Sequence, residues 1–311
     1  MSVRWVSVLL LVTMWAMSAG CSIKKYAINQ VGDILASGGS IYESDEDIEF
    51  VGQALPFSLK LVESLIDESP SHRGLLLAAA RGFVVYSYAY VDFDAEVMAD
   101  VSFEGARELR GRARRFYLRA HRYGVRGLNL FYPGFSSNLV RDPKSTVRMV
   151  ENKKAQDILP FLYWSAASLG LAIASAKNDA AMLARIPEVE ALLERSLELD
   201  ETWDEGALHE FYITLQGAKP GEVDVDDVHT HYQRALELSE GKRASVYLAY
   251  AETVSVPRQR AAEFRDLVAK ALAVDPNAYR ALRLTNLVAQ RRAEWLLSRI
   301  EVLFLDPGEA R

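Results

Sequence analysis

The chain has 311 residues but a single cysteine, so no disulfide can form within it and the fold must depend on its core. It also lacks an excess of positive charge, because 42 Asp and Glu outnumber 36 Lys and Arg, and nothing in this balance indicates a nucleic-acid partner. Enzyme signatures are missing as well: there is no Gly-rich phosphate loop, no HExxH and no nucleophile elbow. We therefore expect a protein that is not an enzyme, needs no cofactor and binds no nucleic acid.

Long apolar runs are also few. Beyond the N-terminus the longest uncharged stretches are residues 161–176 and 82–91. Both are shorter than the ~20 residues that a helix needs to cross a bilayer. We predict that both form buried helices.

The first 20 residues have the organisation of a secretory signal peptide. Arg4 precedes an apolar run from Trp5 to Met17, which is too short for a membrane span. Residues 18–21, Ser-Ala-Gly-Cys, resemble the lipobox of bacterial lipoproteins, and this predicts a palmitate-type lipid anchor on Cys21. Because Ser18 is more often leucine in that motif, a secreted protein with a free thiol is the alternative. Ser22 in place of aspartate favours the outer membrane, with the protein facing the periplasm.

The remainder predicts an all-α protein. Apolar residues recur at helical spacing from about Glu46 to Phe304, whereas strand patterns are scarce. We expect a tether with a short N-terminal helix over residues 21–47 and a helical-repeat domain over 48–311.

One phrase occurs three times in that domain, over residues 193–200, 232–238 and 268–276. Its small residues Ser196, Ala235 and Ala271 are spaced by 39 and 36, close to the ~34 of tetratricopeptide repeats. We predict stacked helical hairpins in a short solenoid, with a last helix over 278–304 that caps the stack. The predicted hairpins are 55–95, 103–198 with a long insert, 204–239 and 242–275.

The insert covers residues 123–154. Gly124, Gly127, Pro133 and Gly134 fall within it, so we expect the repeat to be interrupted here by an ordered loop or short helices. Loops of this length are commonly functional or disordered. After the insert, Asp157 is the expected N-cap of the next helix.

Three strings give the chain a family resemblance: LYWSAASLGLAIA (162–174), VEALLERSLELDETWDEGALHEF (189–211) and LVAQRRAEWLLS (287–298). They resemble, in the same order, the lipoprotein T component of tripartite ATP-independent periplasmic (TRAP) transporters, the TatT-like tetratricopeptide-repeat family. The resemblance implies an all-α repeat fold, a homotrimer, and association with the transporter's periplasmic substrate-binding protein. It also implies a cleft or pore that receives a small organic ligand, and no catalytic motif.

Ligand-contacting residues can be predicted from the repeat, because repeat proteins usually bind on their concave face. Arginine with tyrosine suits capture of a carboxylate with an apolar tail. Alternatively, the arginines pair with Glu198, Glu205 or Glu237 and join adjacent hairpins. We expect Trp164, Trp203 and Trp295 to be packing residues. The predicted groove residues are Arg81, Tyr88, Tyr212, Tyr247, Arg280, Arg283 and Arg291.

Two further clusters have ordinary structural explanations. Asp224, Asp226, Asp227, His229 and His231 could suggest a metal site, but on a helix beginning near Asp227 the ligands do not converge, and we expect no metal. Eight arginines between residues 107 and 126 fit a solvated face with ion pairs, or a surface for an acidic partner or lipid headgroups.

The leading hypothesis is a lipid-anchored scaffold that docks the substrate-binding protein of a TRAP transporter and holds or channels a small carboxylate or hydrophobic ligand. The alternative is a generic tetratricopeptide lipoprotein that assembles envelope complexes and binds no small molecule.

Overall fold

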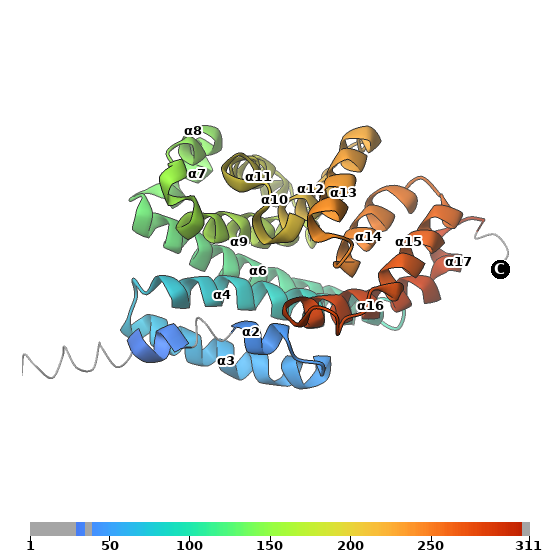
Figure 1. The fold of residues 1–311 in the computed structure, drawn as a ribbon, viewed down its shortest axis with the longest axis horizontal. Coiled ribbons are helices and arrows are strands. Elements are labelled where there is room, and N and C mark those ends of the chain that lie inside the picture. The colour runs from blue at the N-terminus through green and yellow to red at the C-terminus, as the bar shows by residue number, and fades with distance from the viewer. Residues whose placement is uncertain (1–28, 35–38, 307–311) are drawn as a thin grey trace, which may run out of the picture.

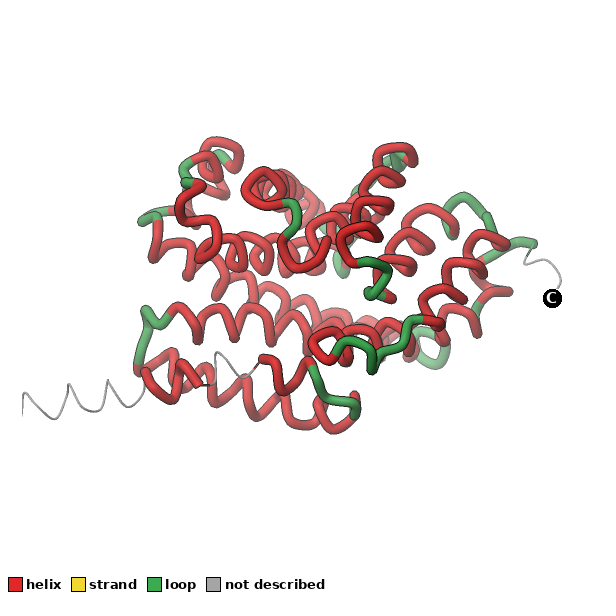
Figure 2. The backbone as a smooth tube through the Cα atoms, in the orientation of Figure 1, coloured by secondary structure: helices red, strands yellow, loops and turns green. Residues whose placement is uncertain are grey.

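The computed structural model describes residues 29–34 and 39–306, and every regular element in these ranges is helical (Figure 2). The predicted all-α class is therefore correct. The predicted signal peptide and Cys21 lie outside the described residues.

The N-terminal part is a stack of long helices. α2 (Gly39–Glu43) leads to α3 (Ile48–Glu68), whose N-cap Asp47 accepts a hydrogen bond from the Phe50 amide. α4 (Arg73–Tyr86) returns beside α3 and continues through the π-helical segment η1 (Ser87–Asp92) into α5 (Phe93–Met98). α6 (Phe103–Phe131) then crosses behind α4, and Figure 1 shows α3, α4 and α6 as successive layers.

The length of α6 corrects the sequence prediction. Gly124 and Gly127 were expected in a break, yet both lie inside this helix and are buried. A methyl group at Gly124 would meet Ser165, and one at Gly127 would meet the ring of Phe161. The glycines therefore let α6 approach α9 closely, and the helix tolerates their low propensity because this packing compensates for it.

The rest of the insert folds into short helices, one of the two predicted alternatives. These are α7 (Phe135–Arg141), α8 (Pro143–Arg148) and the 3₁₀ turn η2 (Asn152–Lys154). α9 (Ala155–Ala174) begins two residues before Asp157, so Asp157 lies in the first turn rather than at the predicted N-cap. Its buried Phe161, Leu162 and Leu169 fill the larger of two main apolar cores.

The C-terminal part contains the segments with the repeated phrase. Ser196, Ala235 and Ala271 are all fully buried, which explains why the phrase needs a small residue there. The helices are α10 (Ala180–Leu183), α11 (Ile186–Asp200), the turn η3 (Trp203–Gly206), α12 (Ala207–Ala218), α13 (Val225–Ser239), α14 (Ala244–Tyr250), the π-helical η4 (Ala251–Ser255) and α15 (Ala261–Ala273).

The last helices return toward the N-terminal part. After η5 (Arg280–Leu282), α16 (Arg283–Ser298) packs on α14 and α15 and also touches α2 and α3, and α17 (Ile300–Leu303) follows it. Figure 1 shows α16 lying between the right-hand helices and the lower N-terminal layer. Contact with both parts means that α16 closes the molecule on itself; the solenoid arrangement and the capping role of this helix stay predictions.

Two helical stretches are long and apolar enough to span a membrane by length and composition, residues 73–98 and 152–174. In the first, 50% of the most apolar window is buried inside the protein, and in the second 67%. Burial of this kind is common for core helices of globular proteins, so these stretches are weak signs of a span.

Candidate functional site

Two π-helical segments face the same region of the interior. η1 carries Tyr88, and η4 carries Glu252. Short π-helical turns inside α-helices are often found at functional sites, because the extra residue re-aims a side chain at a small cost in hydrogen bonding. Here the charge of Glu252 acts on the Tyr88 hydroxyl, although the two residues are far apart in sequence.

Arg292 of α16 joins these segments through two carboxylates. Its guanidinium donates to Glu252 at 2.6 and 2.8 Å and to Glu96 of α5 at 2.7 and 3.3 Å. Burial alone would lower the pKa of Arg292, but the charges of Glu252 and Glu96, together with the Tyr88 hydroxyl, raise it well above its usual value. Arg292 is thus a fully charged group shared between two acids.

A second arginine, Arg243, lies at the start of α14. It is 6% exposed and donates to the Asp204 carbonyl oxygen at 2.8 Å, with the Asp204 carboxylate 3.0 Å away. Glu210 of α12 lies close enough for its charge to act on Arg243. Burial raises the pKa of Glu210, while Arg243 and the nearby Ser245 hydroxyl partly oppose this. The Ser245 hydroxyl is itself buried without a hydrogen bond of normal geometry.

The turn that presents Asp204 has an unusual backbone. Asp204, Glu205 and Gly206 have φ of 48°, 52° and 89°, three consecutive residues in the left-handed region. Such conformations are costly for non-glycine residues and often occur at functional sites. A methyl group on Gly206 would lie 3.1 Å from the Ala235 backbone, so glycine also permits close contact with α13. The string DETWDEGA encodes this turn.

Two tyrosines complete the arrangement. Tyr88 is 40% exposed, yet burial raises the pKa of its hydroxyl to about 12. Tyr163 of α9 is half-buried, and burial raises its pKa further, with Glu210 and Asp204 adding to the effect. We call this set the inner polar cluster: Tyr88, Glu96, Tyr163, Asp204, Glu210, Arg243, Glu252 and Arg292.

The inner polar cluster combines paired arginines with three groups that have no strong partner in the described residues. Both arginines are already paired with carboxylates. The Tyr88 and Tyr163 hydroxyls make no hydrogen bond to any part of the chain that the structure describes, and the Glu210 carboxylate has only the weakly placed Ser245 hydroxyl beside it. The groups that remain open to a ligand are therefore two phenol hydroxyls and one carboxylate.

Two of the predicted groove residues lie at or beside this cluster. Tyr88 is part of it. Arg81 of α4 feels the charges of Asp204 and Tyr163, forms an ion pair with Glu43 of α2, and stands 5.9 Å from the Trp164 ring.

The other two tyrosines and one arginine lie elsewhere. Tyr212 stacks on His231 at 3.7 Å between ring centroids, and its hydroxyl donates to Asp227. Tyr247 packs edge-on against Tyr232 at 6.4 Å. Arg280 is exposed in η5.

Arg283 and Arg291 connect α16 to the N-terminal helices. Arg283 donates to the Ser44 carbonyl oxygen at 2.9 Å, and Arg291 donates to the Ala89 carbonyl oxygen and to Glu49. Two of the three carboxylates expected as alternative partners, Glu198 and Glu237, pair with other arginines.

Among these, Glu198 pairs with Arg195 and Glu237 with Arg234, each at 2.7 Å. The three tryptophans do pack on aromatic neighbours. Trp164 and Trp203 both contact Tyr163, with centroids at 5.0 and 4.8 Å, and Trp295 meets Phe93 at 6.0 Å.

The acidic and histidine-rich segment forms the start of α13. Asp224 is its N-cap, and His231 lies 2.9 Å from His209 between Nδ1 atoms, whereas His229 contacts Gln233 on another face. Within the described residues no group of three or more His, Cys, Asp or Glu is placed to hold a metal ion.

The arginine-rich stretch lies along α6 and is partly paired. Arg107 bonds Glu104 at 3.1 Å, Arg114 lies 3.5 Å from Asp179, and Arg119 lies 2.5 Å from Glu63. Arg126 donates to the Pro70 carbonyl oxygen at 2.8 Å. These contacts fit the ion-paired face that the sequence favoured.

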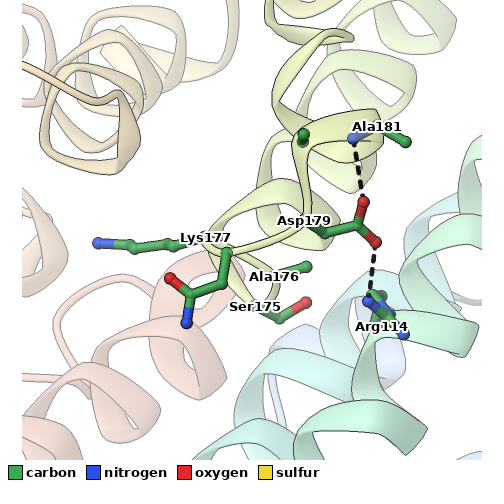
Figure 3. Close-up of a pocket in the computed structure, with 8 residues that line it drawn as sticks. Arg114, Ser175, Ala176, Lys177, Asp179 and Ala181 are labelled. Atoms are coloured by element: carbon green, nitrogen blue, oxygen red, sulfur yellow. Dashed lines mark hydrogen bonds and ion pairs between the residues drawn. The ribbon is translucent and has the colours of Figure 1, made fainter.

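Two surface pockets lie away from the inner polar cluster. One, of about 600 Å³, is formed by Arg114 and residues 175–181. Figure 3 shows that its one carboxylate, Asp179, already bonds both Arg114 and the Ala181 amide. The other, of about 340 Å³, is lined by Arg122, Arg185, His121 and apolar residues of α6 and α7. The Arg185 guanidinium is held by Glu188.

The sequence did not identify Glu210, Arg243, Glu252 or Arg292. A usable signal existed for two of them, since Glu210 and Arg292 occur inside family strings, next to the buried Phe211 and Ala293. A charged residue within such a string is a candidate for a buried, paired role.

Comparison with known proteins agrees with the resemblance found in the sequence. Residues 44–304 match the model of the TRAP transporter T-component family. An uncharacterized protein from Treponema pallidum (strain Nichols) is 27% identical over 304 residues, which cover 93% of this chain and 94% of that protein. The family is one of transporter components and not of enzymes. The chain belongs to the TRAP transporter T-component family.

Proposed function

We propose that this protein is a lipid-anchored scaffold that faces the periplasm, docks the substrate-binding protein of a TRAP transporter and holds or channels a small organic ligand. Family membership supports the link to a TRAP transporter and a membrane-associated, periplasm-facing location. The lipobox supports an anchor on Cys21 in the outer membrane. The single observation that carries the ligand is the pair of Tyr88 and Glu210, which are desolvated but reachable by water and lack strong protein partners.

The open groups restrict the chemistry of that ligand. Arg243 and Arg292 are each paired with carboxylates, so a carboxylate ligand would have to displace Asp204, Glu96 or Glu252. A ligand with hydroxyl or amine donors could bond Glu210 and both phenol oxygens without displacing any of them. Trp164 and Trp203 beside Tyr163 would cover its apolar part.

Native mass spectrometry of protein purified from its own host tests the ligand proposal. We expect a bound small molecule in the wild type and loss of it in Tyr88→Phe and Glu210→Gln. The matched control is Tyr212→Phe, which removes a hydroxyl from the predicted groove outside the cluster. Equal retention in all three variants would contradict a site at the inner polar cluster.

Co-purification tests the docking proposal. The mature protein should capture the substrate-binding protein encoded beside its gene at low salt, and native mass spectrometry of the same sample should report the predicted homotrimer. Purified components that stay separate at low salt would count against docking.

The second candidate is a tetratricopeptide-type lipoprotein that assembles envelope complexes and binds no small molecule. The observation in its favour is that both cluster arginines are paired with carboxylates of the protein itself, as in a purely structural network. It predicts wild-type protein without carried ligand and a Tyr88→Phe variant with unchanged partner binding.

A further inference from the structure

One end of the molecule has a charge opposite to that of the whole chain. Residues 123–154 contain six Lys and Arg and two Asp and Glu, a net charge of +4, although the chain as a whole carries −6. Arg141, Lys144 and Arg148 of α7 and α8 are all exposed. We call these three cations, with their neighbours Val140 and Met149, the basic surface; it lies within the predicted insert and apart from the inner polar cluster.

The cations of the basic surface have no carboxylate partners of their own. Arg141, Lys144 and Arg148 form no ion pair with any residue in the described ranges. The two acids are occupied, because Asp142 caps α8 by accepting from the Ser145 amide at 3.1 Å and Glu151 pairs with Lys153 at 2.9 Å.

Two large apolar side chains are exposed among these cations. Val140 is 66% exposed and Met149 is 44% exposed. Unpaired cations around exposed apolar side chains suit a surface that contacts something anionic on its face and apolar beneath it.

The start of the described chain lies at this same end. Asn29 accepts a hydrogen bond from Ser69 at 2.8 Å, and Arg126 of α6 bonds Pro70 in the same α3–α4 turn. Asn129, one turn further along α6, bonds Ser136 of α7 at 2.9 Å. Figure 1 shows α7 and α8 at the upper left of the molecule and the α3–α4 turn at its lower left.

A short segment therefore ties the predicted anchor to this end of the molecule. Cys21 is eight residues before Asn29. Even a fully extended chain of that length spans only ~28 Å. A lipid on Cys21 would keep this end of the protein near the bilayer.

The far end of α3 has the opposite character. Residues 43–49 contain five acidic residues and no Lys or Arg. The 21 residues of α3 separate this run from the α3–α4 turn by ~31 Å. The acidic run and the basic surface therefore lie toward opposite ends of α3, and three acids of the run are paired with arginines of α4 and α16, namely Glu43, Glu46 and Glu49.

We propose that the basic surface, Arg141, Lys144 and Arg148 with Val140 and Met149, binds anionic phospholipid headgroups of the membrane that holds Cys21. This contact orients the body, so that α2 and the start of α3 point into the periplasm. The inference extends the proposed lipid anchor. The lipid on Cys21 provides most of the membrane affinity, and the basic surface sets the orientation of the body relative to the membrane.

The test is co-sedimentation of the mature chain, residues 21–311 carrying Cys21→Ser, with lipid vesicles. We expect binding to vesicles of phosphatidylcholine with about one-third phosphatidylglycerol, weak binding to pure phosphatidylcholine, and loss of binding near 1 M salt, where the screening length is ~3 Å. The triple variant Arg141→Gln, Lys144→Gln, Arg148→Gln should bind about five-fold more weakly per cation, on the order of a hundred-fold in total.

The matched control removes the same charge elsewhere, in Arg258→Gln, Lys270→Gln, Arg280→Gln. It should bind the anionic vesicles as the wild type does. Equal losses in both triple variants, or equal binding to both vesicle types, would overturn the proposal. Circular dichroism checks that the variants fold, and the single change Arg148→Glu should weaken binding on its own.

A separate measurement keeps this result apart from the proposed function. The intact mass of the protein from its host reports whether Cys21 carries lipid, and the vesicle test uses protein without lipid. Failure of one therefore leaves the other interpretable.

Discussion

The inner polar cluster and the basic surface use the same residue types in opposite ways. In the cluster, Arg292 is held by two carboxylates and is 15% exposed. On the basic surface, Arg148 is exposed and unpaired within the described residues. A buried charged side chain must be paired with an opposite charge, and removal of either partner destabilises the fold. An exposed charge without an ion-pair partner contributes little to stability and mainly affects what the protein binds.

The largest effect should come from unpairing the cluster. Arg292→Met leaves Glu96 and Glu252 facing each other without a cation, and removal of one member of a buried ion pair costs about 3–5 kcal/mol. Since the two carboxylates are 27% and 31% exposed, we expect the lower part of that range. Urea denaturation measures this loss. Arg280→Met is the outside control and should change the free energy of unfolding by less than about 0.5 kcal/mol.

A somewhat smaller effect is expected on the pH dependence of the free energy of unfolding. His121 lies at the α6–α9 contact, where it hydrogen-bonds the Ser165 carbonyl oxygen and Arg185 at 3.0 and 3.1 Å. Burial lowers the pKa of His121 to about 4 from its ordinary 6.5.

The sign follows from which state binds the proton. Between pH 6.5 and 4 the unfolded chain binds a proton at His121 that the folded chain does not, so stability is complete above pH 6.5 and falls toward pH 4. The loss from this residue approaches ~3 kcal/mol. His121→Gln should flatten the pH profile of stability in this interval, and an unchanged slope would mean that His121 is not buried as a neutral group.

The next comparison uses two glycines of the same helix. Gly127→Ala places a methyl group against Phe161, and such overpacking costs about 2 kcal/mol. Gly111→Ala on the outer side meets nothing closer than the Arg115 side chain at 3.6 Å, and should stabilise the helix by about 0.5–1 kcal/mol. Thermal unfolding of both variants gives the sign. Two shifts in the same direction would show that α6 and α9 are not in close contact at Gly127.

The smallest effect should come from the basic surface itself. Removing the charges of Arg141, Lys144 and Arg148 leaves no partner unsatisfied, so the free energy of unfolding should change by less than about 0.5 kcal/mol. Urea denaturation of the triple variant measures it. A loss above ~1 kcal/mol would mean that these cations support the fold, and the contrast between the two regions would disappear.

The sequence predicts the helices well where local patterns decide. The repeated phrase falls in the C-terminal parts of α13 and α15, where Ala235 and Ala271 are fully buried and must be small. The sequence predicts α6 poorly, because glycines such as Gly124 and Gly127 disfavour a helix locally. They are tolerated in α6 because they pack against α9, which is distant in sequence.

The candidate site is harder to predict for a related reason. The repeat pattern placed Tyr88 and Arg81 near a predicted groove. The partners of Arg292 come from α5 and η4, some 196 and 40 residues away, and no local pattern specifies such pairs. The placement of Tyr88 also depends on η1, whose π-helical turn has no clear signature in the string SYAYVD.

The π-helical turn at η1 also sets the rotation of α5 relative to α4. A π turn contains one residue more than an α turn, so deleting a single residue from η1 would leave an uninterrupted α-helix through α4 and α5. The downstream helix would then rotate by ~100° and shift by ~1.5 Å. Glu96 would turn away from α16. The alignment of two distant parts of the chain therefore depends on the presence of a single additional residue.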